Sequence, residues 1–193
     1  MNLPNRLTVL RMLLVPAVAV FTLYDFSAVP MLADWRWLIA GLLFGAAAIT
    51  DAFDGSIARK RGLITDFGKL MDPVADKMLV MSVFICFVAL DLCSPWIVLI
   101  MLLREFVITS IRMVAAGKGS VMAANKWGKA KTVVQTASIG IAYFVLFIEM
   151  FVDPGLAAYA DIVVQVCFWA AAVLTLVSGA IYVYESRELF KDI

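Results

Sequence analysis

Four aspartates carry most of the chemistry that this sequence can perform. Asp51, Asp54, Asp72 and Asp76 all lie within the stretch DAFDGSIARKRGLITDFGKLMDPVADK. The members of each pair are three or four residues apart, so each pair would occupy one face of a helix. Hard divalent cations prefer carboxylate oxygens, and the chain has no histidine that would compete for them. The pattern predicts two carboxylate pairs that together hold two ions, Mg²⁺ by default or Mn²⁺ in its place.

The elements that must position these aspartates are predicted to be membrane-spanning helices. Of the 193 residues, 64% are hydrophobic and 16% are charged, and the mean hydropathy is +0.96. Apolar runs recur at close to the ~20 residues that cross a bilayer, and a spanning segment satisfies its backbone polar groups by becoming helical. We predict an all-α integral membrane protein with a single domain, residues 1–193. Its six spanning helices are expected over residues 8–30, 37–60, 68–92, 95–116, 125–152 and 161–185.

The positions of the basic residues predict the orientation of these helices. If six helices alternate in direction, nearly all lysines and arginines outside the spans fall on one side, together with both termini. Because basic loops favour the cytoplasmic side, we expect both termini there, in a multi-pass protein of a cell membrane such as a bacterial inner membrane. Tryptophans near helix ends are expected to anchor the protein at the interfaces, namely Trp35, Trp37, Trp96 and Trp127.

Helix geometry also predicts the depth of the aspartates. A helix that enters at Trp37 carries Asp51 about 20 Å inward, toward the cytoplasmic end, and the next helix returns from that end. Its carboxylates Asp72 and Asp76 would start about 6 to 12 Å deep, so both pairs can meet at one level. A short connection predicts that the two helices are antiparallel neighbours. The expected result is a polar, metal-binding cavity that opens to the cytoplasm.

Other functions for these charges remain open at this stage. The aspartates could pair with Arg59, Lys69 and Lys77 as ordinary charged helix ends, or they could form the ion path of a small cation transporter. A catalytically silent membrane scaffold is a further alternative. Gly55, Ala58 and Gly68 would leave room beside Arg59 for a diphosphate, or they could serve close helix packing.

The aspartate stretch follows the pattern D-x2-D-G-x2-A-R-x8-G-x3-D-x3-D, which resembles the signature of the CDP-alcohol phosphatidyltransferases. The resemblance implies that a CDP-linked lipid donates its phosphatidyl group to an alcohol and releases CMP. It implies that Asp51, Asp54 and Asp72 bind metal and that Asp76 is both a metal ligand and the general base. It also implies a CDP-lipid site and a homodimer. The CDP-lipid site would comprise Asn5, Arg6, Leu7, Thr8, Gly55, Ala58, Arg59, Thr65 and Gly68.

The N-terminal stretch NLPNRLTVLRMLLVP has its own pattern. Asn5, Thr8 and Arg11 are three residues apart, which places an amide, a hydroxyl and a guanidinium on one helix face toward a polar cavity. The alternative is an amphipathic helix at the interface, with Arg6 and Arg11 extending toward lipid headgroups. A spanning helix is favoured over a cleaved signal peptide because the apolar stretch continues past Val20.

Basic residues outside the signature suggest an anionic acceptor alcohol. Arg104 lies near the middle of the fourth predicted helix, and Arg112 follows eight residues later, close to the same side. With a lysine cluster they could grip a phosphate. Alternatively, Arg104 pairs with Glu105 and the lysines attract anionic headgroups. The predicted acceptor site consists of Arg104, Arg112, Lys126, Lys129 and Lys131.

The segments REF and GKAKT are similar to those of the family branch whose acceptor is sn-glycerol 3-phosphate. The expected substrates are therefore CDP-diacylglycerol and glycerol 3-phosphate, and the expected product is phosphatidylglycerol phosphate. Inositol phosphate and phosphatidylglycerol are alternative acceptors within the same family. Membrane lipid surrounds the protein in this interpretation, and no nucleic-acid partner is expected. Small residues in GLLFGAAA would serve a dimer contact or packing within the chain.

Overall fold

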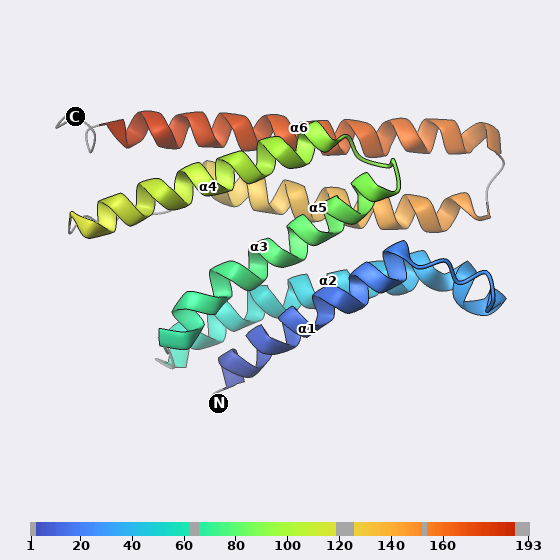
Figure 1. The fold of residues 1–193 in the computed structure, drawn as a ribbon, viewed down its shortest axis with the longest axis horizontal. Coiled ribbons are helices and arrows are strands. Elements are labelled where there is room, and N and C mark those ends of the chain that lie inside the picture. Colours follow the sequence, from blue (N-terminus) through green and yellow to red (C-terminus); the bar gives the residue numbers. More distant parts are fainter. Residues whose placement is uncertain (1–2, 62–65, 119–125, 152–153, 188–193) are drawn as a thin grey trace.

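The computed structural model is helical throughout the elements that it describes. It describes residues 3–61, 66–118, 126–151 and 154–187, with side chains for 7–50, 71, 73–118, 126–151 and 159–187. The helices lie roughly along the longest axis, and both termini lie toward the same end (Figure 1). The elements are α1 (Leu3–Leu23), α2 (Pro30–Arg61), α3 (Asp66–Ala89), α4 (Pro95–Gly117), α5 (Lys126–Glu149) and α6 (Pro154–Glu185).

These elements correspond to the six predicted helices, with differences at their ends. The first helix ends at Leu23 instead of residue 30. A local turn ends it, because the Asp25 carboxylate accepts a hydrogen bond of 3.0 Å from the Ser27 amide. The second begins at Pro30 instead of residue 37 and the sixth at Pro154 instead of residue 161. Proline suits the first turn of a helix, and polar residues that interrupt an apolar run do not interrupt the helix.

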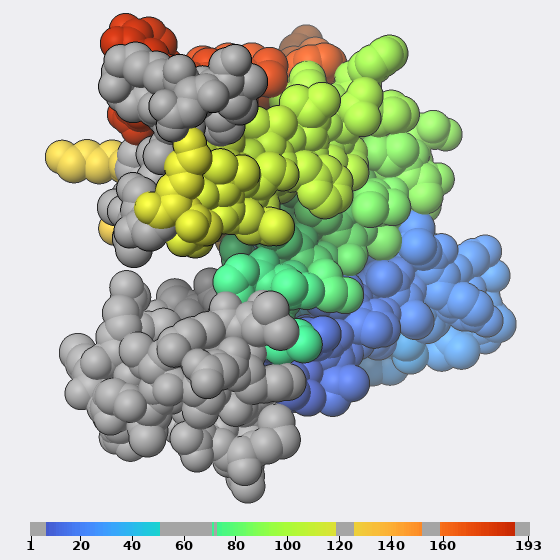
Figure 2. Space-filling view, turned by 60° about the vertical axis from the view of Figure 1, so that its left-hand side comes forward, coloured from blue at the N-terminus to red at the C-terminus, as the bar shows by residue number. Residues whose placement is uncertain are grey.

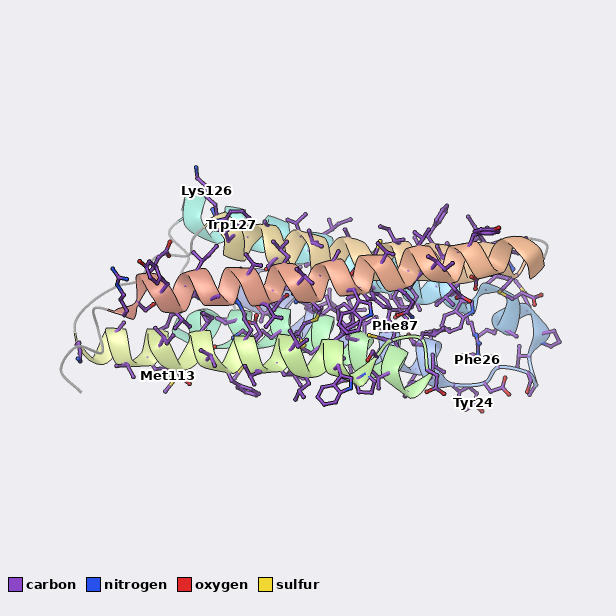
Figure 3. The ribbon with its side chains drawn as sticks, turned by 90° about the horizontal axis from the view of Figure 1, so that it is seen from above. Tyr24, Phe26, Phe87, Met113, Lys126 and Trp127 are labelled. Atoms are coloured by element: carbon purple, nitrogen blue, oxygen red, sulfur yellow. The ribbon has the colours of Figure 1, made fainter. Side chains whose placement is uncertain are left out.

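The core of the bundle is built around aromatic rings. Phe87 contacts Tyr143 and Phe168, with ring centroids 5.1 and 5.6 Å apart, and it lies inside the bundle in Figure 3. The Tyr143 hydroxyl is 2.8 Å from the Thr22 hydroxyl, so a hydrogen bond joins α5 to α1. Buried hydroxyls need such partners in a medium without water. The cluster ties the first half of the chain to the last two helices.

The structure bears on two sequence expectations about this packing. Trp37 is buried in the core and is therefore not an interfacial anchor, whereas Trp35, Trp96 and Trp127 are exposed. Gly41, the first residue of GLLFGAAA, packs inside the chain, because a Cβ at this position would lie 3.0 Å from the Cβ of Tyr143. Close approach of α2 and α5 is the reason for a small residue there.

The outer surface of the bundle is apolar, while charges are found inside it. Large exposed side chains such as Leu13, Phe106 and Phe144 cover the outside, whereas Arg104 and Lys131 are buried. Figure 2 shows the broad outer surface of α4 between α6, in red, and α1, in blue. Three helices in the described part of the chain are long and apolar enough to cross a membrane: Pro30–Thr50, Lys126–Glu149 and Tyr159–Glu185. These features are those of a helical membrane protein.

Helix α1 packs between the two helices that carry the aspartates. Across the described residues it has extensive contacts with both α2 and α3, whereas α2 and α3 touch each other at few positions. The predicted antiparallel pair is therefore separated by α1 over much of its length. The buried face of α1 consists of Thr8, Arg11, Val15, Val18 and Thr22. Spacings of three and four residues define this face.

Candidate active site

The four aspartates lie on two helices that are joined by a short connection. Asp51 and Asp54 are near the end of α2, and Asp72 and Asp76 are in the first half of α3. Their spacings keep each pair on one helix face. The side chains of Asp51, Asp54 and Asp72 are outside the described residues, so their contacts with an ion remain a prediction. The side chain of Asp76 is described, and it is half-buried.

Asp76 lies on the wall between two adjoining cavities. One has a volume of about 630 Å³ and the other about 420 Å³. Both include Asp76, Val80 and Thr132 in their walls. The smaller cavity is mainly apolar, with walls from α2, α3 and α5 such as Ala48 and Leu79. The Asp76 carboxylate can therefore face a polar compound on one side and a lipid on the other.

The larger cavity is strongly basic. Its two carboxylates are Asp76 and Glu105, and α3, α4 and α5 supply more numerous cations. Such an excess of positive charge attracts an anion. Lys126 of the predicted acceptor set does not line this cavity: it is exposed and points away from the bundle in Figure 3. The basic residues in the wall are Lys77, Arg104, Arg112, Lys129 and Lys131.

Glu105 lies at the centre of the basic side chains. Its Oε1 accepts a hydrogen bond of 3.0 Å from Arg104 and a further bond from Lys131. Its Oε2 is 3.5 Å from the Lys77 ammonium. The sequence alternative in which Arg104 pairs with Glu105 is therefore confirmed as a contact. Lys77 also donates to the Thr109 hydroxyl at 2.8 Å, so both of its described contacts are with α4.

Helix α6 supports both arginines although it carries no residue of the predicted site. A Cβ at Gly179 would lie 2.9 Å from Cγ of Arg104, so only glycine leaves room for the arginine stem. Three residues later, the Tyr182 hydroxyl accepts a hydrogen bond of 3.2 Å from Nε of Arg112. The Arg112 guanidinium also lies 5.4 Å from the centroid of the Tyr182 ring, within the range of a cation–π interaction.

The predicted donor site is only partly described. Thr8 is buried and Leu7 is half-buried on α1. Arg11 is buried with 1% of its surface exposed, so it does not extend toward lipid headgroups as the interfacial alternative required. The predicted contacts whose side chains are outside the described residues are Asn5, Arg6, Gly55, Ala58, Arg59, Thr65 and Gly68.

The predicted metal ligands suit a hard divalent ion, although only one of them, Asp76, has a described side chain. The described side chains include no group of three or more histidine, cysteine, aspartate or glutamate residues that could hold a metal. The predicted ligands supply carboxylate oxygens alone, which is the chemistry that Mg²⁺ selects. Asp76, the described member, lines the basic cavity. Its position is compatible with a metal shared with Asp72 one turn earlier.

Sequence reasoning missed the supporting residues of the basic cavity. Glu105 was considered only as a partner of Arg104, and Lys77 only as a partner of the aspartates. A signal for Glu105 was present, because an acid beside an arginine in an apolar helix needs a partner. Nothing in the sequence pointed to Gly179 or Tyr182, since their role depends on the packing of α6 against α4.

A helical membrane protein that places a carboxylate between a basic and an apolar cavity is suited to join an anionic compound to a lipid. Comparison with known families agrees with this class. The chain belongs to the CDP-alcohol phosphatidyltransferase family, whose model matches residues 1–177. The resemblance seen in the aspartate pattern is thereby confirmed over nearly the full length.

Individual relatives are similar along almost the whole chain. A protein of Bacillus subtilis (strain 168) named CDP-diacylglycerol–glycerol-3-phosphate 3-phosphatidyltransferase is 36% identical over 203 residues, covering 98% of this chain and 97% of the relative. A Rickettsia felis protein of the same name is 34% identical, covering 98% and 97%. A Mycobacterium tuberculosis protein named "Probable phosphatidylglycerophosphate synthase" is 37% identical, covering 94% and 80%.

Proposed function

We propose that this chain transfers the phosphatidyl group of CDP-diacylglycerol to sn-glycerol 3-phosphate, giving phosphatidylglycerol phosphate and CMP. The proposal is supported by the family membership and by the names of relatives that align along nearly the whole chain. The observation that carries it is the position of Asp76 between a basic cavity and an apolar one. One substrate is a small dianion and the other is a lipid, and they must meet at one carboxylate.

In this reaction Asp76 acts as the general base. It accepts the proton of the glycerol 3-phosphate hydroxyl while the oxygen attacks the phosphorus that carries the diacylglycerol. The bond between this phosphorus and the CMP oxygen breaks, and CMP leaves with the electron pair. Arg104, Arg112, Lys129 and Lys131 bind the phosphate of the acceptor in the basic cavity, whose 630 Å³ is adequate for a compound of this size. Lys126, exposed at the start of α5, would attract the same anion from solution.

The aspartates would hold the metal ions that this chemistry requires. Asp51, Asp54, Asp72 and Asp76 bind two Mg²⁺ ions, or Mn²⁺ ions, in the proposed active state. When bound, these ions neutralise the diphosphate of the donor and stabilise the leaving CMP. The CDP group binds along α1, α2 and α3, at the residues predicted from the family signature. Gly55, Ala58 and Gly68 give it space, and Arg59 contacts the diphosphate.

We place this site in a bundle of six spanning helices with both termini in the cytoplasm and a polar cavity open to that side. α4 is apolar along most of its length but carries three charged residues, Arg104, Glu105 and Arg112, and so is not among the three candidate spans. Arg104 and Glu105 are buried, while Leu103, Phe106 and Met113 of the same helix are exposed. This arrangement supports contact between α4 and lipid. In this proposal the chain forms one domain, residues 1–193, and functions as a homodimer in a cell membrane.

A cation transporter receives less support from the same site. Five basic side chains line the cavity beside Asp76, and a path for cations is normally lined by acids or carbonyls. The positive charge instead suits a phosphorylated substrate. No described feature favours the transporter over the transferase.

An acceptor panel tests the proposed function. Purified protein in detergent is given labelled CDP-diacylglycerol and Mg²⁺ with glycerol 3-phosphate, inositol phosphate, phosphatidylglycerol or serine. Of the four acceptors, we expect only glycerol 3-phosphate to cause CMP release. EDTA should abolish this release, and excess Mg²⁺ should restore it. Release with inositol phosphate alone would assign another acceptor. If no alcohol releases CMP, the enzyme interpretation fails.

A further inference from the structure

Glu105 contacts basic residues from three helices inside one cavity. Arg104 beside it on α4 and Lys131 on α5 bind its Oε1, and Lys77 on α3 approaches its Oε2. The side chains of Glu105, Arg104 and Lys131 are each about one tenth exposed or less. Both carboxylate oxygens therefore have cationic partners.

Without this carboxylate, the cations would not keep their present arrangement. Three like charges repel one another strongly when they are partly buried, and lysine side chains have many rotamers available. The Glu105 carboxylate offsets the repulsion and gives each cation a fixed partner. Because the three cations come from three helices, it also fixes the spacing of α3, α4 and α5 at the cavity. Removal of one charged partner from such a buried group lowers the folding stability, since the remaining charges are no longer compensated.

Glu105 leaves the cavity positive overall. One carboxylate faces three cations, and two further cations, Arg112 and Lys129, line the same cavity. Arg112 is held separately, by the hydroxyl and ring of Tyr182. A phosphate can therefore still be attracted while Glu105 sets where the cations stand. The cations therefore supply the attraction for the phosphate, and Glu105 supplies their geometry.

We infer that Glu105 is a positioning residue that holds Arg104 and Lys131 where they grip the phosphate of the acceptor, with Lys77 as its third cationic partner. The inference rests on the proposed function, because it assumes that the acceptor is phosphorylated and binds in this cavity. It predicts selectivity for a phosphorylated alcohol over a neutral one, because the fixed cations match the dispersed charge of a phosphate. Glu105 itself contacts the cations and takes no proton from the substrate.

A competing role for Glu105 predicts the opposite change in acceptor binding. If the carboxylate were only an internal anion that competes with the phosphate, its removal would free the cations and tighten acceptor binding. The two effects differ in the sign of the change in KM for the acceptor. A purely structural role would instead change stability, or the KM values of both substrates together.

The test compares Glu105→Gln and Glu105→Asp with the unmodified protein. Gln keeps the shape of the Glu105 side chain and removes its charge, whereas Asp keeps the charge on a side chain that is shorter by one methylene group. We expect both variants to raise KM for glycerol 3-phosphate by on the order of tenfold, with KM for CDP-diacylglycerol changed by less than about twofold. Glu149→Gln is the matched control, since Glu149 lies at the far end of α5, about 27 Å along the helix from Lys131. It should leave both values unchanged.

A double-variant cycle with Lys131→Gln completes the test. If Glu105 acts through Lys131, the Lys131→Gln change should raise KM for the acceptor less in the Glu105→Gln background than in the unmodified protein. Additive effects, an unchanged KM or a lowered KM for the acceptor would overturn the inference. Thermal unfolding identifies a variant that fails to fold, and in that event Glu105→Asp carries the comparison.

The acceptor panel separates this inference from the proposed function. If the unmodified protein uses a different phosphorylated alcohol, the same KM comparison is made with that alcohol, and the inference stands while the proposed acceptor falls. If the unmodified protein uses only an uncharged alcohol, the inference is overturned too. Inorganic phosphate gives a further check as a competing anion. Its inhibition of the unmodified protein should be weakened by Glu105→Gln.

Discussion

Asp76 combines two properties at one carboxylate. It is half-buried on a helix of a membrane protein, and it borders both a basic and an apolar cavity. A carboxylate in such a place is costly unless it has a function or a partner. Its position explains how one side chain could serve a soluble acceptor and a lipid donor together.

The role of Asp76 can be tested with Asp76→Asn. We expect kcat to fall by at least about a hundredfold, because the amide cannot take the hydroxyl proton, while donor binding is largely kept. CMP release and binding of labelled CDP-diacylglycerol would be measured on the same preparation.

A matched control for this change is Asp91→Asn, in the turn that follows the other end of α3. Asp91 is exposed and has a φ of 59°, a conformation that asparagine also adopts readily. The turnover of the Asp91→Asn variant should equal that of the unmodified protein. Undiminished turnover in Asp76→Asn would refute the assigned role as base.

At the scale of elements, α6 shapes a site to which it contributes no predicted ligand. Gly179 and Tyr182 are three residues apart and so lie on one face, where they meet Arg104 and Arg112 of α4. The offset of eight residues between the two arginines keeps them near one side of α4. The pairing of α4 with α6 therefore determines where both guanidinium groups point.

The Gly179→Ala substitution tests this pairing. The added methyl would lie 2.9 Å from Cγ of Arg104, so the arginine must move. We expect KM for glycerol 3-phosphate to rise on the order of tenfold, with a smaller change for the lipid donor.

Gly140→Ala on α5 serves as the control, because nothing lies within 4 Å of a Cβ at that position. It should change neither KM, and alanine is the better helix former. If Gly179→Ala behaves like Gly140→Ala, close approach of α6 to Arg104 has no influence on the acceptor site.

At the scale of the whole molecule, the arrangement of the termini bears on the direction of the site. Both termini lie toward one end of the bundle (Figure 1). Tyr24 and Phe26 lie at the opposite end from Met113 and Lys126 (Figure 3). The proposed orientation puts the end with Met113 and Lys126 in the cytoplasm, which is where a nucleotide-linked substrate is available.

Cysteine labelling in intact cells tests the orientation. In a background with Cys86, Cys93 and Cys167 replaced by alanine, Ser27→Cys should react with a membrane-impermeant maleimide, because it lies in the exposed α1–α2 connection. Lys118→Cys at the end of α4 should react only after the membrane is permeabilised. The reverse pattern would invert the topology, and reaction of both in intact cells would contradict an arrangement with these positions on opposite sides.

The sequence by itself determined the family and the number of helices, and it predicts the four aspartates as the metal ligands. These features depend on local chemistry. The length of an apolar run determines whether it can span a bilayer, and helical spacing determines which residues share a face. Helix ends were less accurate because turns and prolines, such as those at Asp25 and Pro30, act independently of hydropathy.

Only the tertiary structure decided how the basic cavity is organised. It buried Trp37 and Arg11, inserted α1 between α2 and α3, and brought Lys77 and Lys131 onto Glu105. These contacts join residues 26 to 28 positions apart on different helices. Their formation depends on which helix faces meet and at which position along the helix axes they meet. Both are determined by the packing of the whole bundle and not by the periodicity of any one segment.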